Sequence, residues 1–244
     1  MSTDVAVTTS QLPALTDAEK ALGTGQGEIT TDDLILPKLQ ISAAKSKYMK
    51  EESESYIEGL KEGYIFCTLT EQIYGKEIEI VPIKNAGRNR VLFTPSFGVE
   101  CKSDNAVDGG HVSPTCHTCP MAEWGSATKG SGSACTLFEN MVVDVVSGDG
   151  RPRMSLVSFK KKAIETYKKL QTFITMRVDE ATGGAVPQYR GKYKLIVAKA
   201  NGESGPYDVW GVKNAGEVAL KDFETVQRDF FKLQDKGVQL GDNE

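Results

Sequence analysis

The sequence predicts a mainly β fold with attached helices (α+β), built as a small barrel or a highly curved sheet. Short segments rich in Val, Ile, Tyr and Phe recur along the chain and are separated by Gly, Asp and Ser. Two longer segments instead repeat apolar residues at helical spacing. One of these segments lies between strands and the other lies near the end, which is the order expected for a curved sheet that carries helices.

Length and composition limit the classes of protein to which this chain can belong. The 244 residues are 39% hydrophobic and 25% charged, with a net charge of −4, so a chain of this length can bury a core without disulfides. No apolar run approaches the ~18 residues that span a bilayer. Residues 1–7 lack the basic and apolar regions of a signal peptide. We therefore expect a cytoplasmic protein with reduced thiols and no membrane partner.

The predicted elements follow in order along the chain. Pro37 would confine the first strand to a sheet edge, and Gly75-Lys76 marks a turn. Ser147–Gly150 predicts a hairpin turn, and Ile164, Tyr167 and Ile174 mark one face of a helix. The strands are expected at 34–41, 64–69, 78–83, 90–93, 141–146, 154–159, 193–198 and 207–212, and the helices at 160–178 and 218–233.

Three parts are expected along the chain. Residues 1–30 are small, polar and Gly-containing, which predicts a flexible N-terminal arm. Residues 31–215 form the main β domain, and residues 216–244 form a C-terminal helix with a short acidic tail. Within the β domain, residues 97–136 have little periodicity, and a loop this long needs something to organise it.

Four cysteines in this loop predict a metal site. Cys101, Cys116, Cys119 and Cys135 have the spacing C-x14-C-x2-C-x15-C. The short gap lets two thiolates face one ion, and the flanking cysteines complete a tetrahedron, which indicates structural Zn²⁺ and not a catalytic ion with an open position. A structural ion contributes on the order of 10 kcal/mol to folding. Trp124 is expected to pack beside this site.

Other interpretations of the cysteines are weaker. A redox CxxC usually opens a helix in a βαβ setting, whereas this pair lies between Pro114 and Pro120 in a Gly/Ser-rich loop. Disulfides are disfavoured by the expected compartment. His111 and His117 could each replace a cysteine as a ligand. Cys67 alternates with apolar residues in a strand and is expected to be a small core residue.

Positive charge gathers in the middle of an acidic chain. Between Arg151 and Lys199 there are twelve basic and three acidic residues, whereas the first sixty residues hold ten acids and five bases. Aromatic residues such as Tyr189 and Tyr193 interleave with these charges. Cations that bind phosphates, together with rings that stack on bases, are typical of single-stranded nucleic-acid binding. The alternative is that the lysines form a solvated helix face and that the tyrosines belong to the core.

Common catalytic motifs are absent from the sequence. There is no GxxxxGK[ST] loop, no GxGxxG after a strand and no HExxH. Both histidines lie in the cysteine-containing loop, so a Ser-His-Asp or Cys-His centre has no base elsewhere. We therefore expect a non-catalytic protein.

The chain resembles bacteriophage-encoded single-stranded DNA-binding proteins of the replication and recombination cluster, over roughly residues 34–212. The resemblance rests on Leu36–Leu39, Gly63–Phe66, Gly75–Ile83, the cysteine loop with Cys119-Pro120 and Trp124, Met154–Phe159 and Ala163–Leu170. It implies an OB-like β-barrel with the zinc loop inserted between strands, and a location in the host cytoplasm. The strongly acidic tail of many such proteins is reduced here to Gly241–Glu244, so recruitment of partners by the tail is in doubt.

The expected function is therefore sequence-tolerant binding of single-stranded DNA in phage DNA replication or recombination, alongside replication or recombination proteins. A homodimer is left open. Two alternatives are a zinc-ribbon module that binds a polymerase or transcription accessory, and a metal-dependent nuclease. The residues expected to contact DNA are Arg88, Arg90, Phe93, Arg151, Arg153, Lys160, Tyr189, Lys192, Lys194 and Trp210.

Overall fold

The computed structural model describes residues 35–94, 98–128, 132–146, 153–179, 182–202 and 205–234. Contacts divide the chain into Met1–Ile35 and Leu36–Glu244, and the fold below is that of the second unit. The predicted N-terminal arm, the turn at 147–150 and the acidic end of the chain lie outside the described residues.

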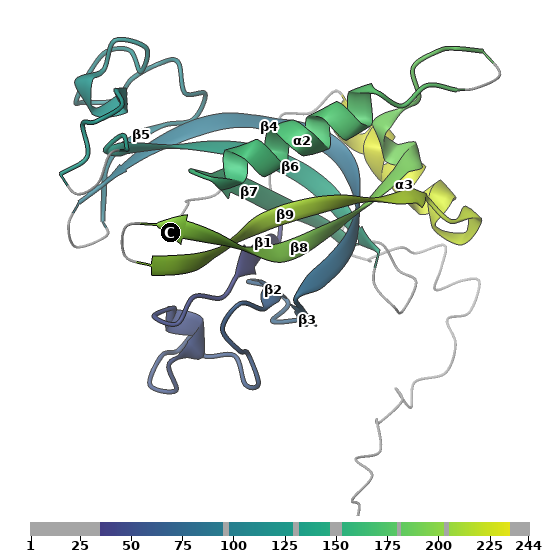
Figure 1. Cartoon of the computed structure of the whole chain (residues 1–244), viewed down its shortest axis with the longest axis horizontal. Coiled ribbons are helices and arrows are strands. Elements are labelled where there is room, and N and C mark those ends of the chain that lie inside the picture. Colours follow the sequence, from purple (N-terminus) through teal and green to yellow (C-terminus); the bar gives the residue numbers. More distant parts are fainter. Residues whose placement is uncertain are drawn as a thin grey trace, which may run out of the picture. The chain divides into compact units, whose positions relative to one another are not determined.

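Nine strands in the described part of the chain form a single sheet, which curls into a half-barrel (Figure 1). Its order is β3-β2-β1-β7-β6-β4-β8-β9, and β5 pairs with β4. This mainly β architecture with two helices is consistent with the predicted OB-like β-barrel. The strands are β1 (Lys38–Ile41), β2 (Ile65–Cys67), β3 (Ile73–Gly75), β4 (Glu77–Phe93), β5 (Val99–Ser103), β6 (Cys135–Val146), β7 (Arg153–Lys160), β8 (Gly191–Gly202) and β9 (Gly205–Glu217).

Strand β4 joins two segments that the sequence predicts as separate strands. It pairs with β8 near its start, with β6 along most of its length and with β5 at its end. Its register with β6 shifts between Pro82 and Lys84 and again between Asn85 and Gly87. Such bulges bend a strand without ending it. The polar residues between Lys84 and Asn89 therefore lie at a bend, and the prediction of a break there is wrong.

Pro37 led us to expect the first strand at a sheet edge, but β1 lies between two other strands. It pairs with β2 on one side and, in parallel, with β7 on the other. Pro37 precedes the first strand residue, so its missing N–H interrupts no ladder bond, while its carbonyl accepts a hydrogen bond from the Leu156 N–H at 2.7 Å. Strands β3 and β5 were also missed, because each is short and lies in a polar stretch.

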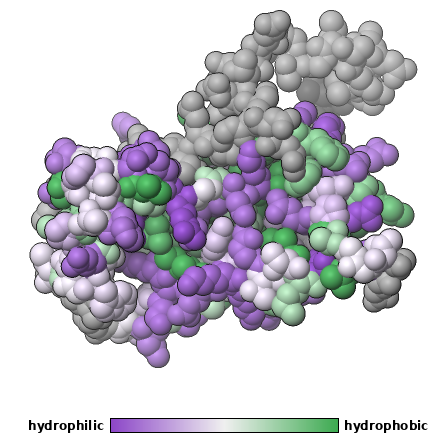
Figure 2. All heavy atoms as spheres, turned by 90° about the horizontal axis from the view of Figure 1, so that it is seen from above, coloured by the Kyte–Doolittle hydropathy of each residue, from purple (hydrophilic) through white to green (hydrophobic). Residues whose placement is uncertain are grey.

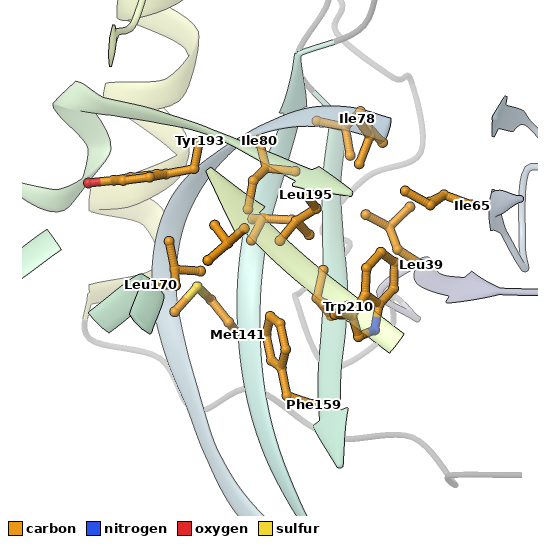
Figure 3. Close-up of a cluster of buried hydrophobic side chains, with 14 of the residues drawn as sticks. Leu39, Ile65, Ile78, Ile80, Met141, Phe159, Leu170, Tyr193, Leu195 and Trp210 are labelled. Carbon is orange, nitrogen blue, oxygen red and sulfur yellow. The ribbon is translucent and has the colours of Figure 1, made fainter. Parts of the chain in front are cut away.

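Both predicted helices are present, and each covers a different core. Helix α2 (Ala163–Thr175) packs Leu170 against residues inside the half-barrel, among them Met141 and Tyr193 (Figure 3). Helix α3 (Leu220–Gln234) packs Val226 onto a second core beside β4 and β6. The short 3-10 helices are η2 (Lys47–Met49), η3 (Pro120–Ala122) and η4 (Gln188–Arg190).

Two further observations concern the distribution of hydrophobic side chains on the surface and the length of the helices. On the face seen in Figure 2, hydrophobic side chains are scattered in small groups among hydrophilic ones. Among the described residues, no helix combines the length and apolar character needed to cross a membrane.

A buried carboxyl lies in the second core. Asp144 of β6 is fully buried, and neither carboxyl oxygen has a hydrogen-bond partner in the described part of the chain. Burial and, to a lesser extent, the charge of Asp229 raise its pKa from 3.8 to about 8, against the opposing effect of Arg228. The folded protein therefore holds a proton that the unfolded chain releases above pH ~4. This group lowers stability progressively as pH rises from about 4 to about 8.

We expect Asp144→Asn to remove this pH-dependent destabilisation, because the amide cannot ionise. The free energy of unfolding of the variant, minus that of the wild type, should rise by up to ~1.4 kcal/mol per pH unit between pH 5 and 8. Urea unfolding at several pH values measures this difference. Asp104→Asn, at an exposed site, is the control and should follow the wild type. A constant difference for Asp144→Asn across this range would contradict the assignment.

Candidate metal centre and nucleic-acid interface

The cysteine loop, which we define as the connection between β4 and β6, is organised by strand pairing. Strand β5 lies in it and places Cys101 opposite Leu92 of β4. Cys135, the first residue of β6, pairs with the same Leu92 from the other side. Between them, Asp108 and Thr115 form an isolated bridge just before the CxxC pair. Strand pairing thereby brings Cys101 and Cys135, which are 34 residues apart in sequence, to the same end of the sheet.

All four cysteines line one small cavity of about 10 Å³, together with Arg90, Leu92 and Gly110. A cavity of this size holds about one atom. Gly110 is required there, because a Cβ at that position would come within 2.7 Å of the Cys101 Sγ. Burial raises the pKa of the Cys135 thiol, Arg90 lowers it, and the charges of Cys116 and Cys119 raise it further.

The thiols are free, and they do not form a coordination shell as they stand. None of the five cysteines is in a disulfide. Within the residues that the structure describes, no group of three or more His, Cys, Asp or Glu side chains has an arrangement that could hold a metal ion. His111 and His117 are exposed. Trp124 is 81% exposed, so the expectation that it packs beside the cysteines is wrong.

A larger cavity, of about 700 Å³, lies where β1, the end of β7 and β9 approach one another. We call it the β1–β9 groove. It combines cationic and aromatic side chains from four elements, and two of them, Lys160 and Trp210, were predicted to contact nucleic acid. The residues that matter below are Lys38, Phe138, Lys160, Lys161, Tyr207 and Trp210.

Lys160 is the best-defined cation of the groove. It pairs with Phe138 across β7 and β6, and its Nζ lies 5.5 Å from the centre of the Phe138 ring. Desolvation, followed by the charge of Lys161, lowers the pKa of Lys160. Lys161 has a φ of 52°, a left-handed conformation that turns the chain from β7 toward α2. Both lysines line the groove.

The aromatic side chains of the groove differ in how exposed they are to solvent. Trp210 is only 6% exposed and belongs to the core of the half-barrel (Figure 3). Its carbonyl accepts a hydrogen bond from Thr166 of α2 at 2.5 Å. Tyr207, near the turn between β8 and β9, is 38% exposed and packs against Gly202, where a Cβ would lie 2.9 Å from the ring. Tyr207 was not predicted, because a single tyrosine at a hairpin gives no sequence signal.

Several predicted basic residues form ion pairs outside the groove. Arg88 pairs with the buried Glu139 at 2.8 Å, and Lys192 pairs with Glu79 at 2.9 Å. Lys194 pairs with Glu77 at 2.8 Å, an interaction that lowers the pKa of Glu77 and raises that of Lys194. None of these three lysine and arginine residues lines the groove as the structure describes it.

The remaining predicted residues fall in four settings. Arg90 donates to the Cys135 carbonyl at 3.4 Å and lines the cysteine cavity. Phe93 ends β4 beside a register shift. Tyr189 is buried against Phe230 of α3, with ring centres 4.6 Å apart, and is not offered to a ligand. Arg151 and the side chain of Arg153 lie outside the described residues.

A buried polar row beside the groove was missed by the sequence analysis. Asn140 of β6 donates to Asn89 of β4 and accepts from Ser158 of β7, both at 2.7 Å. Both asparagines are fully buried, and Ser158 lines the groove. Hydrogen bonds between side chains on three adjacent strands hold those strands in register. The sequence signal was present, since asparagine interrupts an otherwise apolar strand.

Comparison with known proteins gives one result. No curated protein matches the chain, and no solved structure matches it either. A family model described as "Pam3 phage gp34-like protein" matches residues 6–95, which is less than half of the chain. That segment includes β1, β2, β3 and β4 but not the cysteine loop. The similarity to this family suggests a phage protein.

Proposed function

We propose that this protein binds single-stranded DNA without sequence preference and without catalysis, in phage DNA replication or recombination, and that its cysteine loop holds one structural Zn²⁺. The observation that carries the proposal is the β1–β9 groove, where Lys160 and Lys161 lie with an accessible tyrosine ring. Cations for the phosphates and a ring for a base are the two components that single-strand binding requires.

Strand connectivity supports the proposal. Taken in order, β4, β6, β7, β8 and β9 correspond to the five strands of an OB-like barrel, because β4 pairs with both β6 and β8. Helix α2 connects the third of these strands to the fourth. In OB folds, the face of strands 2 and 3 and the loops between strands 1–2 and 4–5 bind oligonucleotides. The corresponding strands here are β6 and β7, which supply Phe138, Ser158 and Lys160 to the groove.

The charges at the groove favour a polyanion. Among the described residues that line it are three lysines and one acidic residue, Asp208, which pairs with Lys199 at 2.8 Å. Each phosphate neutralised by a lysine releases a condensed counterion, so we expect affinity to fall steeply with salt. Base stacking on Tyr207 would add about 1–3 kcal/mol and would tolerate any base.

The cysteine cavity supports the zinc proposal. Four cysteines from β5, the CxxC turn and β6 converge on a space of one atom's size, although no coordinating cluster is formed in the described residues. Four thiolates are a donor set that structural Zn²⁺ prefers. An ion there would fix β5 to the start of β6, three residues before Phe138 of the groove.

We expect Tyr207→Ala to weaken binding of oligo-dT, because it removes the accessible ring. The expected loss is about 1–3 kcal/mol, roughly a 5- to 150-fold rise in Kd, measured by fluorescence anisotropy at low salt. Tyr207→Phe should bind like the wild type, since its ring still stacks. Tyr56→Ala removes a similarly exposed tyrosine outside the groove and is the matched control.

Two results would overturn the DNA-binding proposal. One is the absence of oligo-dT binding by the wild-type protein at low salt. The other is an equal affinity for double-stranded DNA of the same length, since stacking needs unpaired bases. Cleavage of labelled DNA in the presence of magnesium, abolished by a chelator, would overturn the non-catalytic part and favour the nuclease alternative.

Zinc content gives a separate expectation. Native mass spectrometry should find one zinc ion per wild-type chain and none on Cys119→Ser, because three thiolates with one hydroxyl bind Zn²⁺ far more weakly. Cys67→Ser is the control and should keep the ion, because Cys67 is buried in the half-barrel core away from the loop. A wild-type protein with intact thiols and no bound ion would remove the zinc proposal.

A further inference from the structure

The exposed surface of the cysteine loop differs in character from the groove. Four large apolar residues of the loop are at least one-third exposed, and Trp124 is the most exposed at 81%, against 6% for Trp210. Single exposed apolar residues are normal, but four in one loop are not explained by its own packing. They are Val99 at 52%, Val107 at 62%, Met121 at 38% and Trp124 at 81%.

The same loop is acidic. Its described residues include four exposed carboxylates, at Glu100, Asp104, Asp108 and Glu123. Lys102 is the one lysine among them, and it forms an ion pair with Asp104 at 3.2 Å. Negative charge repels nucleic acid, so this surface does not continue the binding properties of the groove.

Apolar and acidic groups meet in one hollow of the loop. A cavity of about 340 Å³ is lined by Val107, Ala122, His117 and Glu123. Arg90 also lines it and donates a hydrogen bond to the Cys135 carbonyl. Trp124 directly follows Glu123 in the chain. Exposed tryptophans are common anchors of protein–protein interfaces, where a few aromatic residues carry most of the binding energy.

We propose that the exposed face of the cysteine loop is a docking surface for another protein, and that the docking segment carries basic and apolar side chains. Charge complementarity selects the basic residues, which would pair with Glu123 and Asp108, while apolar residues would cover Trp124 and Val107. This surface is separate from the groove, so the inference does not depend on DNA binding.

The test uses a short fluorescein-labelled peptide in which lysines and leucines alternate, and a second peptide with glutamate in place of every lysine. We expect the full-length protein to bind the lysine peptide and not the glutamate peptide, as measured by anisotropy. Trp124→Ala should weaken binding at least about tenfold, and Glu123→Gln should weaken it less and reduce its salt dependence. Because Trp124 is 81% exposed, its removal leaves both cores intact.

Controls separate this surface from the proposed function. Phe231→Ala removes an aromatic residue that is 60% exposed on α3 and should leave peptide binding unchanged. Trp124→Ala should bind oligo-dT like the wild type. If no variant binds oligo-dT but the peptide still binds through Trp124, the DNA proposal fails and this inference stands.

Three outcomes would overturn the inference. Equal binding of both peptides, or no loss in Trp124→Ala, would show that the loop does not recognise a basic segment. A loss of oligo-dT affinity in Trp124→Ala would make the loop part of the nucleic-acid surface. Sedimentation showing a dimer that Trp124→Ala dissociates would identify a second copy of this chain as the occupant.

Discussion

The pairing of β4 with three other strands shapes the sheet and positions the cysteines. Strand β4 has seventeen residues and pairs with β8 near its start, with β6 along most of its length and with β5 at its end. Two register shifts bend it, so that the sheet curls. Because Cys101 and Cys135 both pair with Leu92, the same strand also decides where the cysteines meet.

The fold was largely predictable because its elements are strongly patterned. Apolar runs such as Met141–Val146 and the helical repeat around Leu170 gave strands and helices in the right order. The predictions failed where pairing with distant strands overrode what the local residues indicated. Polar residues at Lys84–Asn89 suggested a break, but bulges carry the strand through them, and Pro37 suggested an edge although it lies outside the ladder.

The candidate sites were less predictable, since they depend on partners distant in sequence. The four cysteines could be grouped by spacing, and they do line one cavity. The basic segment overstated the local positive charge, because many of its cations form ion pairs with carboxylates. These ion pairs are Lys162–Glu165, Arg177–Glu217, Lys192–Glu79, Lys194–Glu77 and Lys199–Asp208. Lys160 and Lys161 remain at the groove, and the rings beside them come from β6 and β9.

The two proposed recognition surfaces have opposite charge. The groove offers lysines and a tyrosine, and the cysteine loop offers carboxylates and a tryptophan. Both are held by β6, which begins at Cys135 and reaches the groove at Phe138. A metal ion bound by the cysteines would therefore stabilise the strand that supplies both surfaces.

Photo-crosslinking would locate bound DNA on the protein. Oligonucleotides containing 5-iododeoxyuridine would be irradiated with the full-length protein, and the cross-linked peptides identified by mass spectrometry. Cross-links concentrated on Tyr207 and on the peptides that carry Phe138 and Lys160 would place the DNA in the β1–β9 groove. Cross-links confined to α3 or to the Lys192–Lys194 side of the sheet, with none at the groove, would contradict the account.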